Sequence, residues 1–174
     1  MNIKPETFFV KDDGIFPNSH LPVLYYPQVL DLPRLFAGGA VRNLFKKNNW
    51  GNNWKAGIYT YHHYHSICHE VLGFIKGETL LLLGGESGVT IFVEKGDVLV
   101  IPAGVAHINL GKEKDITCIG GYAGGRDYDM KYGEPGERTK ADNNIQSVPL
   151  PETDPVTGVV QGLPEIWNEK SNNG

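Results

Sequence analysis

Histidines are concentrated in one short stretch of this sequence. Of six in the chain, four fall within eight residues: His62, His63, His65 and His69. On a regular strand alternate residues share a face, so we expect His63 and His65 to point the same way, close enough for both imidazoles to bind one ion. Glu70 follows at the start of the next expected strand. Two neutral imidazoles and one carboxylate favour a metal site that needs a further ligand.

A candidate for that further ligand lies in the segment GDVLVIPAGVAH, residues 96–107. Asp97–Ile101 is expected to be an apolar strand, the turn at Pro102–Gly104 reverses it, and His107 begins the return. In a closed or double-sheet β architecture this places His107 across the interior from His63 and His65. The two segments together therefore predict one metal site.

Short strands must position these side chains. Seven segments are rich in β-branched, aromatic or leucine residues: Ala56–His65, Glu70–Lys76, Glu78–Leu83, Val89–Val93, Asp97–Ile101, Ala106–Leu110 and Ile116–Tyr122. Glycine-containing turn signals separate most of them. The connections are too short for helical crossovers, so the strands are expected to pair antiparallel in a sandwich or barrel over residues 56–124.

The flanking regions differ in composition and in sequence pattern. Residues 1–55 are expected to form an arm with edge strands at Phe8–Val10 and Leu21–Tyr26 and a helical pattern over Asp31–Lys47. Residues 125–174 are polar and rich in proline, and we expect an irregular tail packed on the barrel. The chain is thus interpreted as a single domain.

Composition excludes several classes of protein. The 174 residues are 40% hydrophobic and 21% charged, which is typical of one globular domain. The net charge of −4 (16 basic, 20 acidic) has no basic stripe, so we expect no nucleic-acid partner. Cys68 and Cys118 make no disulfide framework. No signal-peptide pattern or membrane-length apolar run is present, which favours a cytoplasmic protein with no membrane partner.

Oligomerisation is a further expectation. The first 30 residues carry apolar side chains that could pair across a subunit boundary, namely Phe8, Phe9, Leu24 and Tyr25. We therefore predict a homodimer in which this arm contributes to the interface.

The two ligand segments match known sequence motifs. The first cupin motif is complete, with Gly57, His63, His65, Glu70 and Gly77. Most of the second is present, with Gly96, Pro102, Gly104 and His107. Its usual final asparagine is replaced by Gly111, while Asn109 lies two residues earlier on the face expected for His107. The chain resembles the cupin family.

The resemblance extends beyond the motifs. The segments GIFPNSHLPVLYY, HHYHSICHEVLG, GGRDYDMKYGEPGER and PLPETDPVTG are similar to bacterial YjlB-like cupins. This resemblance implies an all-β fold, a double-stranded β-helix (jelly roll, cupin barrel), here with one N-terminal helical segment and extended terminal arms. It also implies a mononuclear metal site at His63, His65, Glu70 and His107. Because many chemistries use this fold, it implies no particular reaction.

Other residues near the motifs have competing interpretations. The four ligand-type residues could instead be core polar groups satisfied by hydrogen bonds, which is the less favoured reading. His62 and His69 are expected at the surface or in supporting hydrogen bonds rather than as ligands. Cys68 is expected to pack as a small hydrophobe rather than serve as a soft ligand or reactive thiol, and Cys118 belongs to the core.

Several polar and aromatic residues are candidates for a pocket. Tyr59 and Tyr61 share the predicted ligand face and could bind a substrate, although filling the core is an equal alternative. Asn109 is the third pocket candidate. The charged residues after the last strand are more typical of a solvated turn than of a pocket rim: Arg126, Asp127, Asp129 and Arg138.

Three imidazoles and one carboxylate leave one or two octahedral positions open, which is typical of a catalytic site. One divalent transition metal is expected. Iron or manganese would suit oxygen-dependent cleavage or decarboxylation of a small organic acid or enediol, and zinc or nickel would suit Lewis-acid isomerisation or hydrolysis. The alternative is a metal-dependent module that binds or senses a small molecule without turnover. A structural zinc is less favoured, because such sites are usually rich in cysteine.

Overall fold

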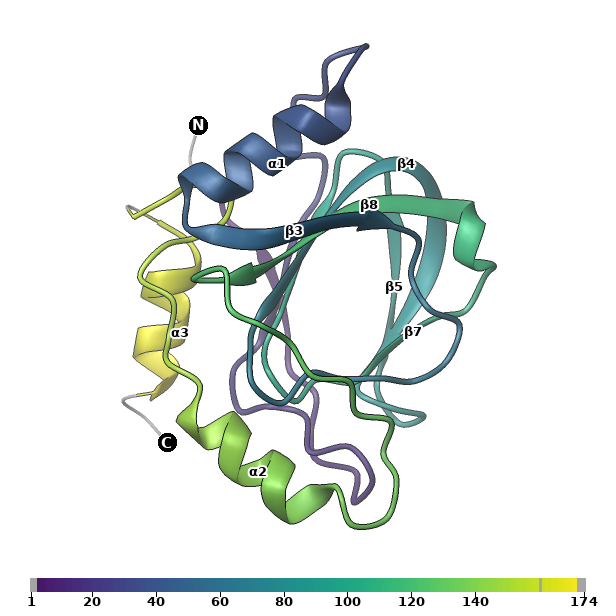
Figure 1. The fold of residues 1–174 in the computed structure, drawn as a ribbon, viewed down its shortest axis with the longest axis vertical. Helices are drawn as coiled ribbons and strands as arrows, with labels where there is room; N and C mark the ends of the chain where they lie inside the picture. The colour runs from purple at the N-terminus through teal and green to yellow at the C-terminus, as the bar shows by residue number, and fades with distance from the viewer. Residues whose placement is uncertain (1–2, 160, 172–174) are drawn as a thin grey trace.

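Two antiparallel sheets form the centre of the computed structural model, which describes residues 3–159 and 161–171 (Figure 1). The strands are β1 Glu6–Phe8, β2 Val23–Tyr26, β3 Trp50–Ala56, β4 Glu70–Leu83, β5 Val89–Glu94, β6 Val98–Ile101, β7 His107–Asn109 and β8 Ile116–Ala123. The larger sheet has the order β1-β2-β6-β4-β8-β3, and β5 and β7 flank β4 in the second sheet. The predicted all-β jelly-roll class is confirmed.

The long strand β4 belongs to both sheets. Its first half, from Glu70, pairs with β6 and β8, and its second half, up to Leu83, pairs with β5 and β7. Two separate strands with a turn near Gly77 were expected here. The chain instead bends without breaking, because Gly77 takes φ +79° and a Cβ there would lie 1.9 Å from the carbonyl oxygen of Asp115. Glycine thus supplies a kink in a continuous strand.

Apolar side chains fill both faces of the larger sheet. Alternate residues of β4 point in opposite directions, so Leu72 and Phe74 belong to the cluster between the sheets. Val71, between Glu70 and Leu72, belongs to a second cluster on the outer face. Burial on both faces fixes the register of β4, because a slip of one residue would exchange the two sets.

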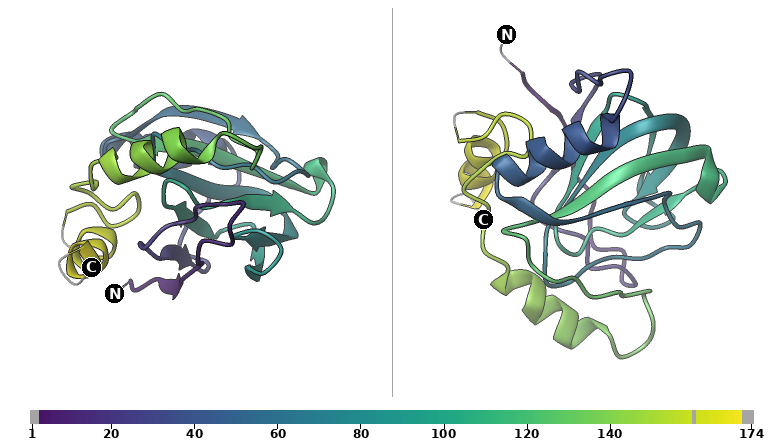
Figure 2. Two further views of the ribbon diagram at one scale, coloured as in Figure 1. Left: turned by 90° about the horizontal axis from the view of Figure 1, so that it is seen from below. Right: turned by 45° about the horizontal axis from the view of Figure 1, so that its top comes forward.

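Helix α1 covers part of that outer face and spans Ala37–Lys47 (Figure 2). It begins later than the predicted Asp31, because Phe36 takes a left-handed backbone conformation with φ 63° and cannot continue a right-handed helix. The close approach of α1 to the sheet depends on Gly73 of β4. A Cβ at that position would lie 2.8 Å from both Phe45 and Val41.

The C-terminal region contains two helices where an irregular tail was expected, α2 at Arg138–Ser147 and α3 at Leu163–Ser171. Helix α3 is held by Leu163 and Trp167, which are four residues apart and fully buried. In helix α2 the buried residue is Ala141. A helix that buries one small side chain needs no stripe of apolar residues, so its sequence shows little apolar periodicity. None of the helices among the described residues has the length and apolar content that a membrane span needs.

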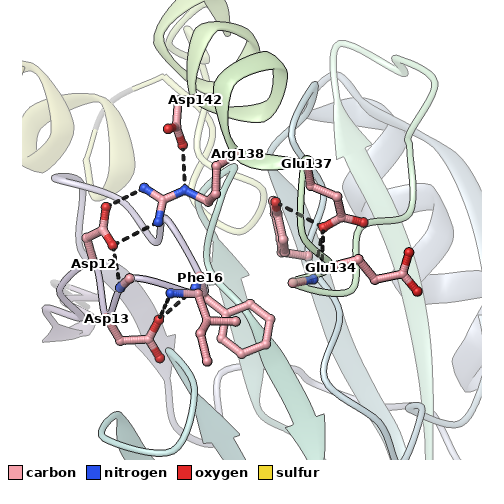
Figure 3. Close-up of polar contacts among 11 residues, drawn as sticks. Asp12, Asp13, Phe16, Glu134, Glu137, Arg138 and Asp142 are labelled. Carbon is pink, nitrogen blue, oxygen red and sulfur yellow. Dashed lines mark hydrogen bonds and ion pairs between the residues drawn. The ribbon is translucent and has the colours of Figure 1, made fainter.

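The N-terminal arm packs on the barrel of its own chain. Strand β1 pairs with β2, and β2 pairs with β6. Leu24 is fully buried, Phe8 and Tyr25 pack against the core, and Phe9 is half exposed. The arm also contacts α2, because the guanidinium of Arg138 donates hydrogen bonds to the carboxylates of Asp12 and Asp142 (Figure 3).

Candidate metal centre

Three buried histidines converge inside the barrel. His63, His65 and His107 each offer a ring nitrogen, and these atoms all lie within 4.8 Å of one another. His63 and His107 face each other directly, since the amide of His63 donates to the carbonyl of His107 at 3.3 Å and the amide of His107 donates back at 3.0 Å. The sequence predicted this grouping from the two motif segments.

The segment carrying His63 and His65 is less regular than predicted. Strand β3 ends at Ala56, so residues 57–62 do not continue it as the expected strand Ala56–His65 required. The chain nevertheless runs antiparallel beside residues 104–109, because Gly104 donates to the carbonyl of His65 and Asn109 donates to that of Tyr59. This pairing keeps both imidazoles on the inner side.

Glu70 lies beside two of the three histidines. It is the first residue of β4, and its Oε2 lies 3.4 Å from Nε2 of His65 and 3.3 Å from Nε2 of His107. The same oxygen is buried and accepts no hydrogen bond within the described part of the chain. A buried carboxylate oxygen without a hydrogen-bond donor is costly unless a cation compensates it. The arrangement of Glu70 therefore fits a bound metal ion.

Backbone carbonyls fix the orientation of each imidazole. Nδ1 of His63 donates to Tyr61 at 3.1 Å, Nδ1 of His107 donates to Val105 at 3.1 Å, and Nδ1 of His65 donates to the carbonyl of Asp129. A proton on Nδ1 leaves Nε2 as the free lone pair, which is the form that ligates a metal. All three histidines thus share the tautomer that a metal site requires.

The charges of the cluster follow from burial and proximity. Burial, with His107 close by, lowers the pKa of His63 to about 3, so this imidazole is neutral at pH 7. Burial by itself would raise the pKa of Glu70, but His65 and His107 hold it well below its usual range. Burial opposes protonation of His65 as well, yet the Glu70 carboxylate raises the pKa of His65 above its usual value. An ionised carboxylate beside imidazoles is the donor set that divalent metals take.

A cavity of about 340 Å³ adjoins the cluster. Besides the four predicted ligands its wall includes Asn52, Asn53, Trp54, Ala56, Gly57, Ile58, Tyr59, Leu72, Tyr122, Tyr128 and Met130. Tyr59 was predicted as a pocket residue and lines this cavity. Tyr61 is not part of the lining, but its ring stacks on that of Tyr59 with centroids 4.8 Å apart.

Asn109, the third predicted pocket residue, lies outside the lining. Its Oδ1 accepts hydrogen bonds from Thr79 and from the amide of Gly111, at 2.7 and 2.9 Å. Its Nδ2 donates to the carbonyls of Ile58 and Lys112. The amide is occupied within the protein, which differs from the prediction that it would face a ligand.

Asp129 has a role that its place in a charged turn did not indicate. Its carboxylate accepts hydrogen bonds from the amide of Ser66, at 2.6 Å, and from the Ser66 hydroxyl. Asn144 of α2 donates to the same hydroxyl at 2.9 Å. Because the carbonyl of Asp129 orients His65, these bonds link the segment after β8 to the histidine cluster.

The remaining candidates lie outside the cluster. The ring of His62 packs against Phe16 with centroids 5.2 Å apart. Nδ1 of His69 accepts a hydrogen bond from the amide of Ala103 at 3.0 Å, and its ring lies against Trp167. Cys68 is buried, which raises the pKa of its thiol, and Cys118 is fully buried in the core.

Comparison with known proteins identifies one close relative. The chain is 40% identical over 168 residues to the "Uncharacterized protein YjlB" of Bacillus subtilis, covering 96% of this chain and 99% of that protein. No protein-family model matches the chain.

Solved structures give weaker likenesses. Acireductone dioxygenase from Bacillus anthracis, with a cadmium ion in its active centre, has a TM-score of 0.43 and 14% identity over 63% of this chain and 83% of that one. The vicilin of Solanum melongena has a TM-score of 0.36 and 20% identity over 52% and 26% of the two chains. Both TM-scores lie below 0.5, so these likenesses give no information about what this chain does.

Proposed function

Because the chain belongs to the YjlB-like family of cupins, we propose that it binds one divalent transition-metal ion through His63, His65, Glu70 and His107. The observation that carries this proposal is the buried Oε2 of Glu70, which accepts no hydrogen bond among the described residues and faces two Nε2 atoms at 3.3 and 3.4 Å. A cation there would satisfy the carboxylate and use the lone pairs that the Nδ1 hydrogen bonds leave free.

We further propose that the site is catalytic. Four protein ligands leave one or two octahedral positions, and the adjoining cavity gives a small molecule access to them. A bound divalent ion supplies Lewis acidity, and iron or manganese also supplies redox chemistry. The protein would contribute oriented imidazoles, one compensating charge at Glu70 and an aromatic wall that limits water.

The proposed substrate is a small anionic or enediol-type molecule. A divalent ion with a single carboxylate ligand keeps a net positive charge, which attracts and polarises anionic oxygen. The volume of about 340 Å³ suits a compact ligand. Oxygenation, decarboxylation and isomerisation are the reaction types that this site could support. The alternative function is metal-dependent binding or sensing without turnover.

Elemental analysis tests the metal ligands. Purified protein should carry close to one transition-metal ion per chain, and His107→Ala should lose most of it. His62→Ala is the matched control, since that neighbouring imidazole packs against Phe16 instead. Full metal retention by the His107 variant would contradict the ligand assignment.

A substrate screen tests catalysis. Protein loaded with iron, manganese, nickel or zinc is assayed with small organic acids, diketones and sugar-derived acids while oxygen uptake and product are followed. Activity that survives in Glu70→Gln and in metal-free protein would place the chemistry elsewhere. Tight binding without product under every metal would favour the binding alternative.

Two expectations from the sequence remain proposals. The first is a homodimer in which the N-terminal arm contributes to the interface, and light scattering at micromolar concentration tests it. A sharp monomer mass would refute the dimer. The second is a cytoplasmic location, which fractionation of the native host tests.

A further inference from the structure

Tyr122 places a hydroxyl group in the wall of the cavity beside the metal ligands. It lies directly opposite Glu70 in the pairing of β8 with β4, and residues opposite each other in antiparallel strands project to the same face. Its ring contacts that of His65 edge to face, with centroids 5.7 Å apart, and stacks on Tyr128 at 5.0 Å. Tyr122 is 2% exposed and lines the cavity.

The Tyr122 hydroxyl accepts a hydrogen bond but donates none among the described residues. Nε1 of Trp54 donates to the Tyr122 oxygen at 3.0 Å, so the oxygen acts as an acceptor on that side. A phenol also carries one proton to donate, and no acceptor for it is present among the described residues. A tyrosine hydroxyl has an ordinary pKa of about 10, so it carries this proton at pH 7.

A bulge in β3 and a glycine in β8 hold Trp54 in place. The register of β3 against β8 shifts between Gly51 and Trp54, which re-aims the side chains that follow. Trp54 then pairs with Gly120, where a Cβ would lie 2.0 Å from the indole ring. The indole can therefore occupy the space beside Gly120 and reach Tyr122 because residue 120 has no side chain.

We propose that Tyr122 is a ligand-binding residue, which donates a hydrogen bond to an oxygen of the small anion held at the metal, with Trp54 as the residue that positions its hydroxyl. This inference rests on the proposed function and narrows the ligand class. The ligand needs one oxygen for the metal and a second acceptor oxygen for Tyr122, as carboxylates, 2-oxo acids and enediolates provide. A small molecule that coordinates the metal but has no second acceptor atom gains no binding energy from Tyr122.

The test uses full-length protein loaded with Co²⁺, whose visible spectrum reports binding at the metal. Oxalate is the probe with a second acceptor oxygen, and imidazole is the probe without one. Tyr122→Phe should weaken oxalate binding roughly 10- to 100-fold, the range for one hydrogen bond to a charged acceptor, and leave imidazole binding within about twofold. Trp54→Phe should weaken oxalate binding by a smaller factor, since the hydroxyl remains but is free to rotate.

Tyr64→Phe is the matched control, because it removes the hydroxyl of another buried tyrosine, one that faces Glu137. Its oxalate affinity should equal that of the wild type. Equal oxalate affinity in the Tyr122 variant, or an equal loss for oxalate and imidazole, would overturn the role of Tyr122 while the metal site stands. Failure of the wild type to bind Co²⁺ would overturn the proposed function and this inference with it.

Discussion

Asp129 should control metal affinity although its side chain is not a ligand. The substitution Asp129→Ala removes two acceptor contacts to Ser66, from the backbone amide and from the hydroxyl. These contacts hold the segment whose carbonyl, that of Asp129, accepts a hydrogen bond from Nδ1 of His65. Without them the carbonyl is free to move, and the imidazole loses its fixed orientation and tautomer.

Two effects of different size follow. Loss of supporting hydrogen bonds around a ligating histidine typically lowers metal affinity by about 10- to 100-fold. Each hydrogen bond to a charged group contributes about 1.5–3 kcal/mol, and the lower end applies to the half-buried Asp129, which gives roughly 3 kcal/mol for the pair. For a domain of this size that corresponds to a fall in melting temperature of roughly 6–12 °C.

Chelator competition measures the metal affinity, and calorimetry of metal-free and metal-loaded protein measures the melting temperatures. Asp127→Ala is the matched control, because Asp127 is an exposed carboxylate in the same segment. Asp129→Asn should be intermediate, since its amide oxygen can still accept one of the two bonds. A lower melting temperature with unchanged metal affinity would refute the link between Asp129 and His65.

Three further predictions concern stability. The folded pKa of His69 is about 3 against 6.5 in the unfolded chain, chiefly through burial, so below pH 6.5 the unfolded state binds a proton that the folded state does not. The free energy of unfolding of metal-free protein should therefore fall as pH decreases from about 6.5 toward 3. Between pH 7 and 5, urea titrations should show that the free energy of unfolding of His69→Gln falls by roughly 2 kcal/mol less than that of the wild type. An equal fall in both proteins would contradict this. Gly73→Ala should lower the free energy of unfolding by about 1–3 kcal/mol, because its Cβ would lie 2.8 Å from Phe45 and Val41, and an unchanged urea midpoint would show that α1 shifts freely. Arg138→Ala breaks partly exposed ion pairs with Asp12 and Asp142, so it should cost no more than about 1 kcal/mol and leave metal affinity unchanged. A larger loss in calorimetry would mean that α2 and the arm act as one unit.

Local spacing was sufficient to predict that the proposed ligands would lie close together. His63, His65 and Glu70 lie within eight residues, and the turn before His107 returns the chain to the same interior. Most of the strands from Glu70 onward could likewise be predicted, because alternating apolar residues between glycine turns leave few other structures. Strand β3 at Trp50–Ala56 was not predicted, and the strand expected over Ala56–His65 is not formed. The structure brings these four residues together even though the segment before His63 is not a regular strand.

Residues that meet only through the topology could not be predicted. Trp54, Tyr122 and Asp129 come from β3, β8 and the segment after it, and no spacing rule relates them to His65 or Glu70. Helix α2 was missed for a different reason, since its polar sequence lacks apolar periodicity. Gly77 was interpreted as a turn because a glycine that bends a strand and a glycine that ends one have the same local signal.

The sharing of β4 between both sheets has a consequence for synthesis on the ribosome. Residues 70–83 find their partners only in β5, β6, β7 and β8, which are all made later and extend to Ala123. Until then the run from Leu80 to Leu83 has no partner strand and is prone to pair with other chains. The strand that joins both sheets of the finished protein is thus a segment at risk of aggregation while the chain is incomplete.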